Sequence, residues 1–364
     1  MTLQHQHQPI LCSNDSTHLK LQRFLIFLLF TSFFQNEVLS ATTSRFFANG
    51  PHIRPEETAV IVNDADPSSV QISEYYLQAR KIPKENLIHV YHVNPKPNIT
   101  RNQFDQLKNT ITKQLSEQHK IVVFAWSQPF AVECNSITSA FTMGFDGSVC
   151  KNTCAATKPN PYFNQPSNQP YEDYHIRLSM LLPSHIFETS KKVIDQGVLS
   201  DNGVFKSTAY FLQTSDAARS SRAAFFPKNG VAIPRTGLSV ATIKSDKLES
   251  AKDVMIYHTG LTWVPSLETL NFLPGALADH LTSFGGDLFG QGQMNVMRWL
   301  EAGATASYGT VSEPCNHWQK FPNSIVLLQW YASGATAIEA YWKSVAWPAQ
   351  GLFVGEPLAS PFAK

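Results

Sequence analysis

The sequence predicts a three-layer α/β/α fold with a mostly parallel sheet, built as one large domain. Short apolar runs rich in β-branched residues alternate along the chain with stretches of helical periodicity, and this βαβ rhythm is typical of parallel sheets. One run, KIVVFAW at 120–126, is nearly continuous in apolar residues, as expected for a central strand covered on both faces. The content of 43% hydrophobic and 16% charged residues is that of an ordinary globular protein.

The first half of the chain supplies two strand–helix units. TAVIVN at 58–63 predicts a strand, and Asp66 followed by Pro67 predicts the cap and first turn of a helix that ends before Pro83. A second strand is expected at 86–93. A second helix follows, with its apolar stripe over 104–115.

An irregular excursion is expected at about 128–173. This stretch carries three cysteines and the proline-rich segment KPNPYFNQPSNQP. It is too long for an ordinary connection between two elements, so we expect it to cover part of the domain or to serve its function.

The second half continues the same alternation. A helix at 184–198 is expected to end at Gly197, a helix is expected to start near Ser215, and the last helical stretch, 324–345, reads as one continuous helix. The remaining elements are expected as strands at 174–182, 207–216, 253–260, 276–281, 304–311 and 351–355 and a helix at 293–303.

The amino-terminal residues 1–40 have the pattern of a secretory signal peptide. Lys20 and Arg23 precede the apolar run FLIFLLFTSFF, and small residues follow it. A bilayer span needs about 20 apolar residues, so a permanent anchor is disfavoured, and we expect a domain over 41–364 without a membrane span. The expected location is the periplasm or the exterior of a bacterial cell.

Charge balance excludes a nucleic-acid partner. The chain has 29 basic and 28 acidic residues and no run of four or more lysines or arginines. The glycine-rich GGDLFGQG lacks the spacing and strand context of a dinucleotide fingerprint, so no cofactor is expected.

Four cysteines remain once the leader is removed: Cys134, Cys150, Cys154 and Cys315. An even number in an exported chain indicates disulfides rather than a metal site, because the paired two-residue spacers of zinc sites are missing. Three pairings are possible. We favour Cys150 with Cys154, which can close a small local ring, and Cys134 with Cys315.

Polar residues follow several of the predicted strands. In a parallel sheet these positions border one crevice, which is the default place for a site. The substrate-binding candidates are Asn63, Asp64, Gln128 and Glu313. No metal site is assigned. A metal ion held by Asp64, Asp66 or Asp216 is the open alternative.

Four stretches carry a resemblance to a family of exported bacterial proteins found with exosortase-type protein sorting. They are VNDADPSSVQISEYYLQARKIPKENLIHV, FLPGALADHLTSFGG, WLEAGATASYGTVSEPC and EAYWKSVAWPAQGLFVGEPLASP. The likeness runs from about 57 to 361. It implies export but no established activity.

A more distant resemblance gives the fold a caspase-like strand order. VMIYHTG, LADHLTSFGG and GATASYGT are similar in order to segments of the gingipain-type cysteine peptidases. That resemblance implies that His258 is the base and that Thr282 or Ser283 stands where the thiol stands. This chain departs from the pattern because Thr259 separates His258 from Gly260 and no cysteine lies near 283.

Two functions follow. The first is a serine-type, peptidase-related hydrolase that processes envelope or surface proteins, with Ser283 as nucleophile, His258 as base (His280 being the other candidate), Asp216 or Asp279 as orienting acid, and the backbone N–H groups of the FGG bend as oxyanion donors. The second is a non-catalytic binding or assembly module that presents the crevice to a protein or glycan partner.

Overall fold

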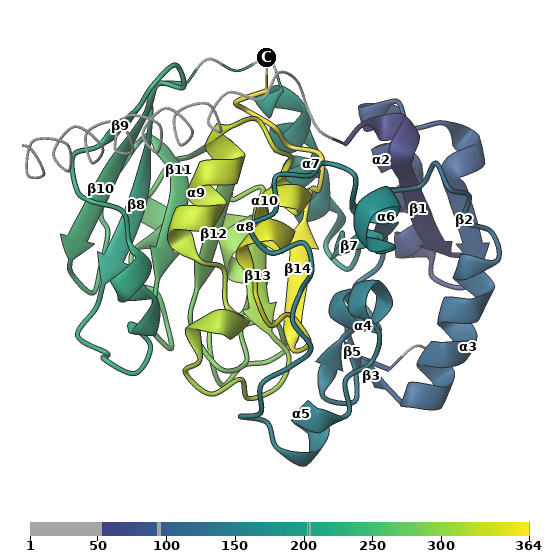
Figure 1. Ribbon diagram of the computed structural model, residues 1–364. Helices are drawn as coiled ribbons and strands as arrows, with labels where there is room; N and C mark the ends of the chain where they lie inside the picture. Colours follow the sequence, from purple (N-terminus) through teal and green to yellow (C-terminus); the bar gives the residue numbers. More distant parts are fainter. Residues whose placement is uncertain (1–52, 93–95, 202, 204, 364) are drawn as a thin grey trace, which may run out of the picture. The chain divides into compact units, whose positions relative to one another are not determined.

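Eleven strands form the central sheet of the computed structural model, which describes residues 53–92, 96–201, 203 and 205–363 (Figure 1). The predicted signal peptide lies outside these residues. The strands follow the order β2-β1-β4-β7-β14-β13-β12-β11-β8-β10-β9. Their bounds are β1 Thr58–Asn63, β2 Leu87–Val90, β4 Ile121–Phe124, β7 Leu178–Leu181, β8 Ser207–Gln213, β9 Ala232–Ile233, β10 Leu238–Lys244, β11 Val254–Thr259, β12 Phe272–His280, β13 Ala306–Thr310 and β14 Gly351–Gly355.

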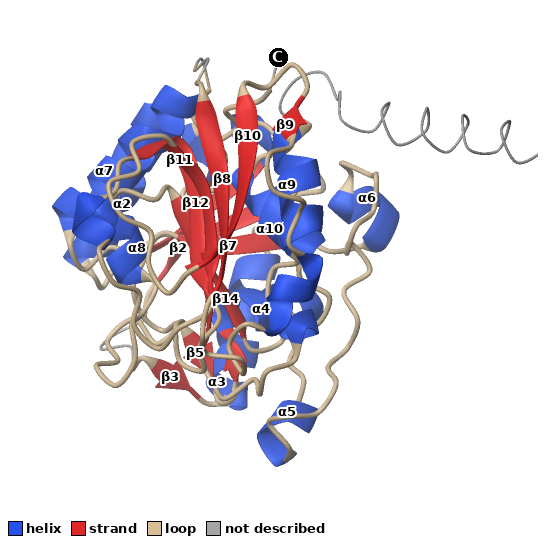
Figure 2. Cartoon of the chain, turned by 90° about the vertical axis from the view of Figure 1, so that its left-hand side faces the viewer, coloured by secondary structure: helices blue, strands red, loops and turns tan. Residues whose placement is uncertain are grey.

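Parallel pairing dominates the sheet, as the sequence predicts. It joins β2, β1, β4 and β7 in one half and β13, β12, β11, β8 and β10 in the other. Antiparallel pairs join β13 to β14 and β10 to β9. Helices cover both faces of the sheet (Figure 2). The α-helices among the described residues are α2 Pro67–Arg80, α3 Arg101–Thr112, α4 Ile137–Met143, α5 Ser148–Lys151, α6 Pro170–Tyr174, α7 Phe187–Ser200, α8 Met297–Ala302, α9 Ser324–Ala332 and α10 Ala337–Ser344.

The segments that follow β4, β7 and β12 meet at one edge of the sheet, which we call the carboxyl edge. The ring of Phe289, after β12, lies 6.1 Å from that of Phe130, after β4, and 5.2 Å from that of His185, after β7. The carboxyl-terminal end of α7 lies at the opposite edge of the sheet, where a Cβ on Gly275 of β12 would lie 2.8 Å from the Ser200 side chain. Residues from both halves of the sheet therefore share this carboxyl edge.

Local signals place β1 and α2 where the sequence predicts them. The β-branched run of β1 is buried at every residue. The Asp66 carboxylate accepts a hydrogen bond from the Ser68 backbone N–H at 3.0 Å, and Pro67 is the first helical residue. The strand, the cap and the start of the helix are thus confirmed together.

Helix α7 continues past Gly197, which we expected to end it. The carboxylate of Glu356 lies against this glycine, and a Cβ there would stand 2.2 Å from Glu356 Oε2. Gly197 is therefore required for close packing rather than for a cap.

The last helical stretch is two helices, α9 and α10, where one continuous helix was predicted. Gly334, between them, has a φ of +94°, which the α-helix cannot accommodate. The helix predicted from Ser215 is only a short 3₁₀ turn at Ser221–Phe225. β10, the strand that pairs with β8, was not predicted.

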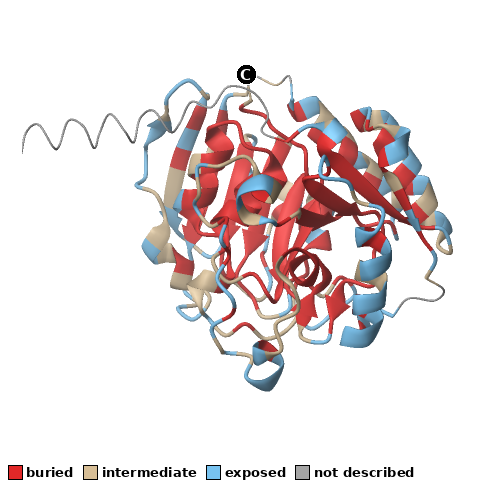
Figure 3. Cartoon of the chain, turned by 45° about the vertical axis from the view of Figure 1, so that its right-hand side comes forward, coloured by how far each residue is buried: buried red, intermediate tan, exposed pale blue. Residues whose placement is uncertain are grey.

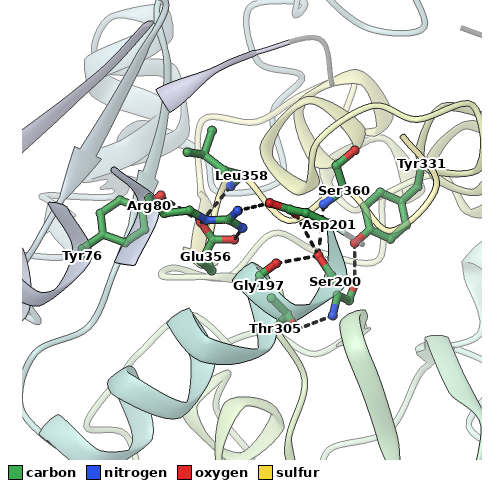
Figure 4. A network of polar contacts seen from close by, with 11 residues as sticks. Tyr76, Arg80, Gly197, Ser200, Asp201, Thr305, Tyr331, Glu356, Leu358 and Ser360 are labelled. Atoms are coloured by element: carbon green, nitrogen blue, oxygen red, sulfur yellow. Dashed lines mark hydrogen bonds and ion pairs between the residues drawn. The ribbon is translucent and has the colours of Figure 1, made fainter. Parts of the chain in front are cut away.

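A buried ionic network joins α2, α7 and the end of β14 (Figure 4). Arg80 of α2 donates from Nε and Nη2 to the Glu356 carboxylate, at 2.9 and 2.5 Å, and the Tyr76 hydroxyl donates to Glu356 Oε1 at 2.9 Å. Arg80 also pairs with Asp201 at the end of α7. Residues almost 280 positions apart are held together here.

The excursion at 128–173 is less irregular than expected. It contains a small sheet of β5 Ala131–Val132 and β6 Asn135–Ser136, which joins β3 Asn98–Ile99. Helix α4 packs on β7 and β14, and its side chains are buried over most of its length. The excursion is thus partly built into the core.

Two disulfides are present, but the favoured pairing was wrong. Cys134 bonds Cys150, and Cys154 bonds Cys315. The turn at Cys134 meets the segment of Cys150 because the Asn135 side chain donates to and accepts from the Asp146 backbone, at 3.0 Å each. Such pairs are typical of oxidising, extracytoplasmic compartments. No helix within the described ranges has the length and apolar character that a bilayer span requires.

Candidate functional site at the carboxyl edge

A pocket of about 340 Å³ opens at the carboxyl edge. Its lining comes from three segments, those that follow β8, β12 and β13. The lining residues are Ala218, Arg219, Leu281, Thr282, Ser283, Glu313, Pro314, Cys315 and Asn316. This volume lies in the range of small-ligand pockets, at its lower end.

Glycines let the three segments approach one another closely. A Cβ on Gly260, after β11, would lie 1.9 Å from the carbonyl oxygen of Arg219. The bend after Ser283 packs on β13, where a Cβ on Gly309 would lie 2.4 Å from the Gly285 carbonyl carbon. The glycine-rich stretch therefore serves backbone packing beside the pocket.

Two of the three backbone N–H groups of this bend are already engaged. The Gly286 N–H donates to the Thr310 carbonyl at 2.9 Å, and the Phe284 N–H donates to Gln293 Oε1 at 3.0 Å. They are not directed together at a point above Ser283, as oxyanion donors would have to be.

His258 lies in a buried polar cluster with Asp279, Ser324 and Arg222. Its Nδ1 is 2.8 Å from the Ser324 hydroxyl oxygen, and its Nε2 is 3.0 Å from Asp279 Oδ2, although that pair lacks hydrogen-bond alignment. Arg222 donates to Asp279 Oδ1 at 2.5 Å and to the Thr259 carbonyl at 2.9 Å. All four side chains are inaccessible to solvent (Figure 3 shows the buried strands).

Burial sets the charges in this cluster. It lowers the pKa of His258, and the attraction of Asp279 only partly opposes that effect. Burial alone would raise the pKa of Asp279, but Arg222 and His258 outweigh it, so this pKa is lowered. The cluster therefore holds an ionised Asp279–Arg222 pair and a neutral imidazole at pH 7.

The three predicted catalytic residues are not brought together. Ser283 lines the pocket, and its hydroxyl has no hydrogen-bond partner among the residues described. Asp216 binds Arg219 at 2.7 Å, on the rim of the same pocket. His258 makes its contacts with Ser324 and Asp279 instead.

Of the four predicted substrate-binding residues, Glu313 lines the pocket. The Asn63 side chain donates a hydrogen bond to the His92 backbone carbonyl at 3.0 Å. Asp64 forms an exposed ion pair with His89 at 2.8 Å. Gln128 precedes Pro129 in a cis peptide bond and is half-buried. These three do not line the pocket.

Arg219 was missed by the sequence analysis, although it supplies the pocket's guanidinium. The signal was present: Asp216 and Arg219 have opposite charges three residues apart in a loop that follows a predicted strand. Cys315 and Asn316, also missed, directly follow the candidate Glu313 and Pro314.

Acidification is expected to destabilise the fold through His280, which is buried at the end of β12 and accepts a hydrogen bond from Trp299 Nε1 at 2.9 Å. Burial lowers the pKa of His280 to about 4. Because the unfolded chain has the ordinary pKa of about 6.5, the stability from the neutral ring is complete above pH 6.5 and is lost as pH falls to 4. The loss is about 3 kcal/mol.

Urea unfolding between pH 4 and 7 measures this loss. His280→Asn, which retains an acceptor for Trp299, should reduce the pH dependence to the part that buried His258 contributes, whereas the matched change at exposed His89 should leave it unchanged. A variant with the wild-type slope would contradict the assignment.

Within the described ranges, no three His, Cys, Asp or Glu side chains lie close enough to hold a metal ion. Comparisons with protein-family models, with curated proteins and with solved structures gave no match. The site is therefore interpreted from its own geometry.

Proposed function

We propose that this chain is an exported, non-catalytic binding module on a caspase-like scaffold, with the carboxyl-edge pocket as its ligand site. One observation carries the proposal: both ring nitrogens of His258 lie against buried partners, Ser324 and Asp279. A general base must reach the proton that it removes. His258 is engaged with these partners, and the other candidate base, His280, accepts a hydrogen bond from Trp299, so neither histidine is hydrogen-bonded to Ser283.

The order of the strands supports the scaffold. β11 and β12 are parallel neighbours, and His258 is in register with Asp279. The resemblance to gingipain-type peptidases predicts a base after one strand and a nucleophile after the next. In this chain those positions hold a buried histidine and a serine, so the arrangement is that of a peptidase scaffold without its reactive pair.

A second Ser–His pair at the carboxyl edge does not restore hydrolysis. The Ser127 hydroxyl lies 2.6 Å from His185 Nδ1, but its oxygen also accepts the backbone N–H groups of Ser184 and His185, at 2.8 and 2.9 Å. Ser127 is only 4% exposed. Its lone pairs are engaged in holding the turn after β7, which is a structural role.

Labelling with a fluorophosphonate probe tests the proposal. The purified, oxidised protein should show no stoichiometric labelling, and Ser283→Ala should give the same background as the wild type, because an unassisted hydroxyl is a poor nucleophile. Labelling that disappears in Ser283→Ala would establish the hydrolase instead and reject the binding module.

A further inference from the structure

Exposed aromatic side chains lie on the loops that follow β11 and β12. Trp263, after β11, is 51% exposed, and Phe284 and Phe289, after β12, are 42% and 40% exposed. Aromatic rings of this size are usually buried, so their exposure on adjoining loops marks a contact surface.

Phe284 belongs to a segment that lines the pocket, and Trp263 belongs to a loop that packs against another such segment. Phe284 directly follows Ser283, and Gln293 Oε1 accepts both the Phe284 N–H and the Thr282 hydroxyl, the latter at 2.7 Å. Trp263 lies on the loop whose Gly260 packs against Arg219, and the neighbouring Thr262 carbonyl accepts the Met294 N–H. The loops that carry Trp263 and Phe284 are therefore connected to the segments that line the pocket.

The basic side chain that lines the pocket, Arg219, is already paired. Arg219 is paired with Asp216 through its guanidinium and its backbone N–H. Glu313 accepts the Cys315 N–H at 2.7 Å, and it attracts the ammonium of Lys320, a side chain whose pKa is lowered to about 8 by burial. An anionic ligand would therefore find no unpaired basic side chain among the residues that line the pocket.

Neutral hydrogen-bonding groups remain for a ligand. The Ser283 hydroxyl both donates and accepts, and the exposed Asn316 amide does the same. Such groups suit a molecule with many hydroxyls, since each hydroxyl is also both donor and acceptor.

From this combination we infer that the pocket binds a neutral oligosaccharide. Sugar hydroxyls would exchange hydrogen bonds with Ser283 and Asn316, while the apolar faces of adjoining sugar rings would pack on Trp263 and Phe284. The inference rests on the proposed binding function and gives it a ligand class.

Titration of the full, oxidised chain with neutral trisaccharides tests this inference by calorimetry and by Trp fluorescence. The probes are maltotriose, cellotriose, mannotriose and triacetylchitotriose, with trigalacturonic acid and trialanine as charged comparisons. At least one neutral probe should bind saturably, and Trp263→Ala and Phe284→Ala should each weaken it about tenfold. Leu199→Ala is the matched control, since Leu199 is an exposed apolar residue, 59% accessible, at the far end of α7.

Two results overturn the ligand class. One is the absence of saturable binding by any neutral trisaccharide up to its solubility limit. The other is binding that the two aromatic substitutions leave unchanged. If trialanine or the acidic sugar binds instead, the pocket is a binding site for a different ligand. Only Ser283-dependent probe labelling rejects the binding function itself, so the two failures are distinguishable.

Discussion

Replacing Cys154 and Cys315 by alanine is expected to lower the free energy of unfolding by about 5 kcal/mol. This disulfide spans 161 positions, and the entropy that a cross-link removes from the unfolded chain grows with loop length. The same estimate gives about 3 kcal/mol for Cys134–Cys150, which spans 16 positions. Total stabilities of domains are about 5–15 kcal/mol, so the longer bridge should decide whether the fold persists at 37 °C.

Urea unfolding of the two double-alanine variants measures the difference. Cys134→Ala/Cys150→Ala is the matched control, because the two bridges close separate, non-overlapping loops. Loss of the longer bridge should lower the urea midpoint of unfolding more than loss of the shorter one. It should also loosen the pocket, which Cys315 lines. Equal losses, or a larger loss for the shorter bridge, would contradict the loop-length argument.

The disulfide partners show where sequence reasoning stops. A separation of four residues makes Cys150–Cys154 locally feasible, but the observed partners are set by contacts between distant segments. One such contact is the hydrogen bond that Lys320 Nζ donates to the Thr153 carbonyl at 2.6 Å, next in sequence to Cys154 of the Cys154–Cys315 disulfide. No local pattern encodes that proximity.

Signals confined to a few neighbouring residues were the reliable ones. The strand at 58–63 and the Asp66–Pro67 helix start depend on β-branching, side-chain capping and a fixed φ, and all three act within a few residues. Gly197 failed as a signal because its role is set by Glu356, far along the chain. A glycine can end a helix or allow another side chain to pack closely against the helix, and only the tertiary structure distinguishes the two roles.

The candidate site followed the same division. The rule that polar residues after parallel strands border a crevice selected Ser283 and Glu313, which line the pocket, and also Asn63, Asp64 and Gln128, which do not. It could not say that His258 would face Ser324, 66 positions away, because strand patterning does not name the element that covers each face. The edge of the sheet at which these residues lie could be predicted, but the side chains that they contact could not.

Replacing Glu356 by glutamine is expected to lower the free energy of unfolding by about 3–5 kcal/mol. Glu356 is fully buried, and the substitution keeps the side-chain shape that packs on Gly197 while removing the charge that faces Arg80. Arg80 would keep only the partly exposed Asp201 as counter-charge. A buried charge left without its main partner has a penalty of this size.

Exposed ion pairs provide the comparison. Glu301→Gln removes the surface partner of Arg298, at 2.9 Å, and should change stability by less than about 1 kcal/mol. Arg80→Met combined with Glu356→Gln should recover part of the loss, because no unpaired guanidinium then remains buried. If Glu356→Gln were as mild as Glu301→Gln in urea unfolding, the network that joins α2, α7 and β14 would not hold the two halves of the sheet together as its geometry implies.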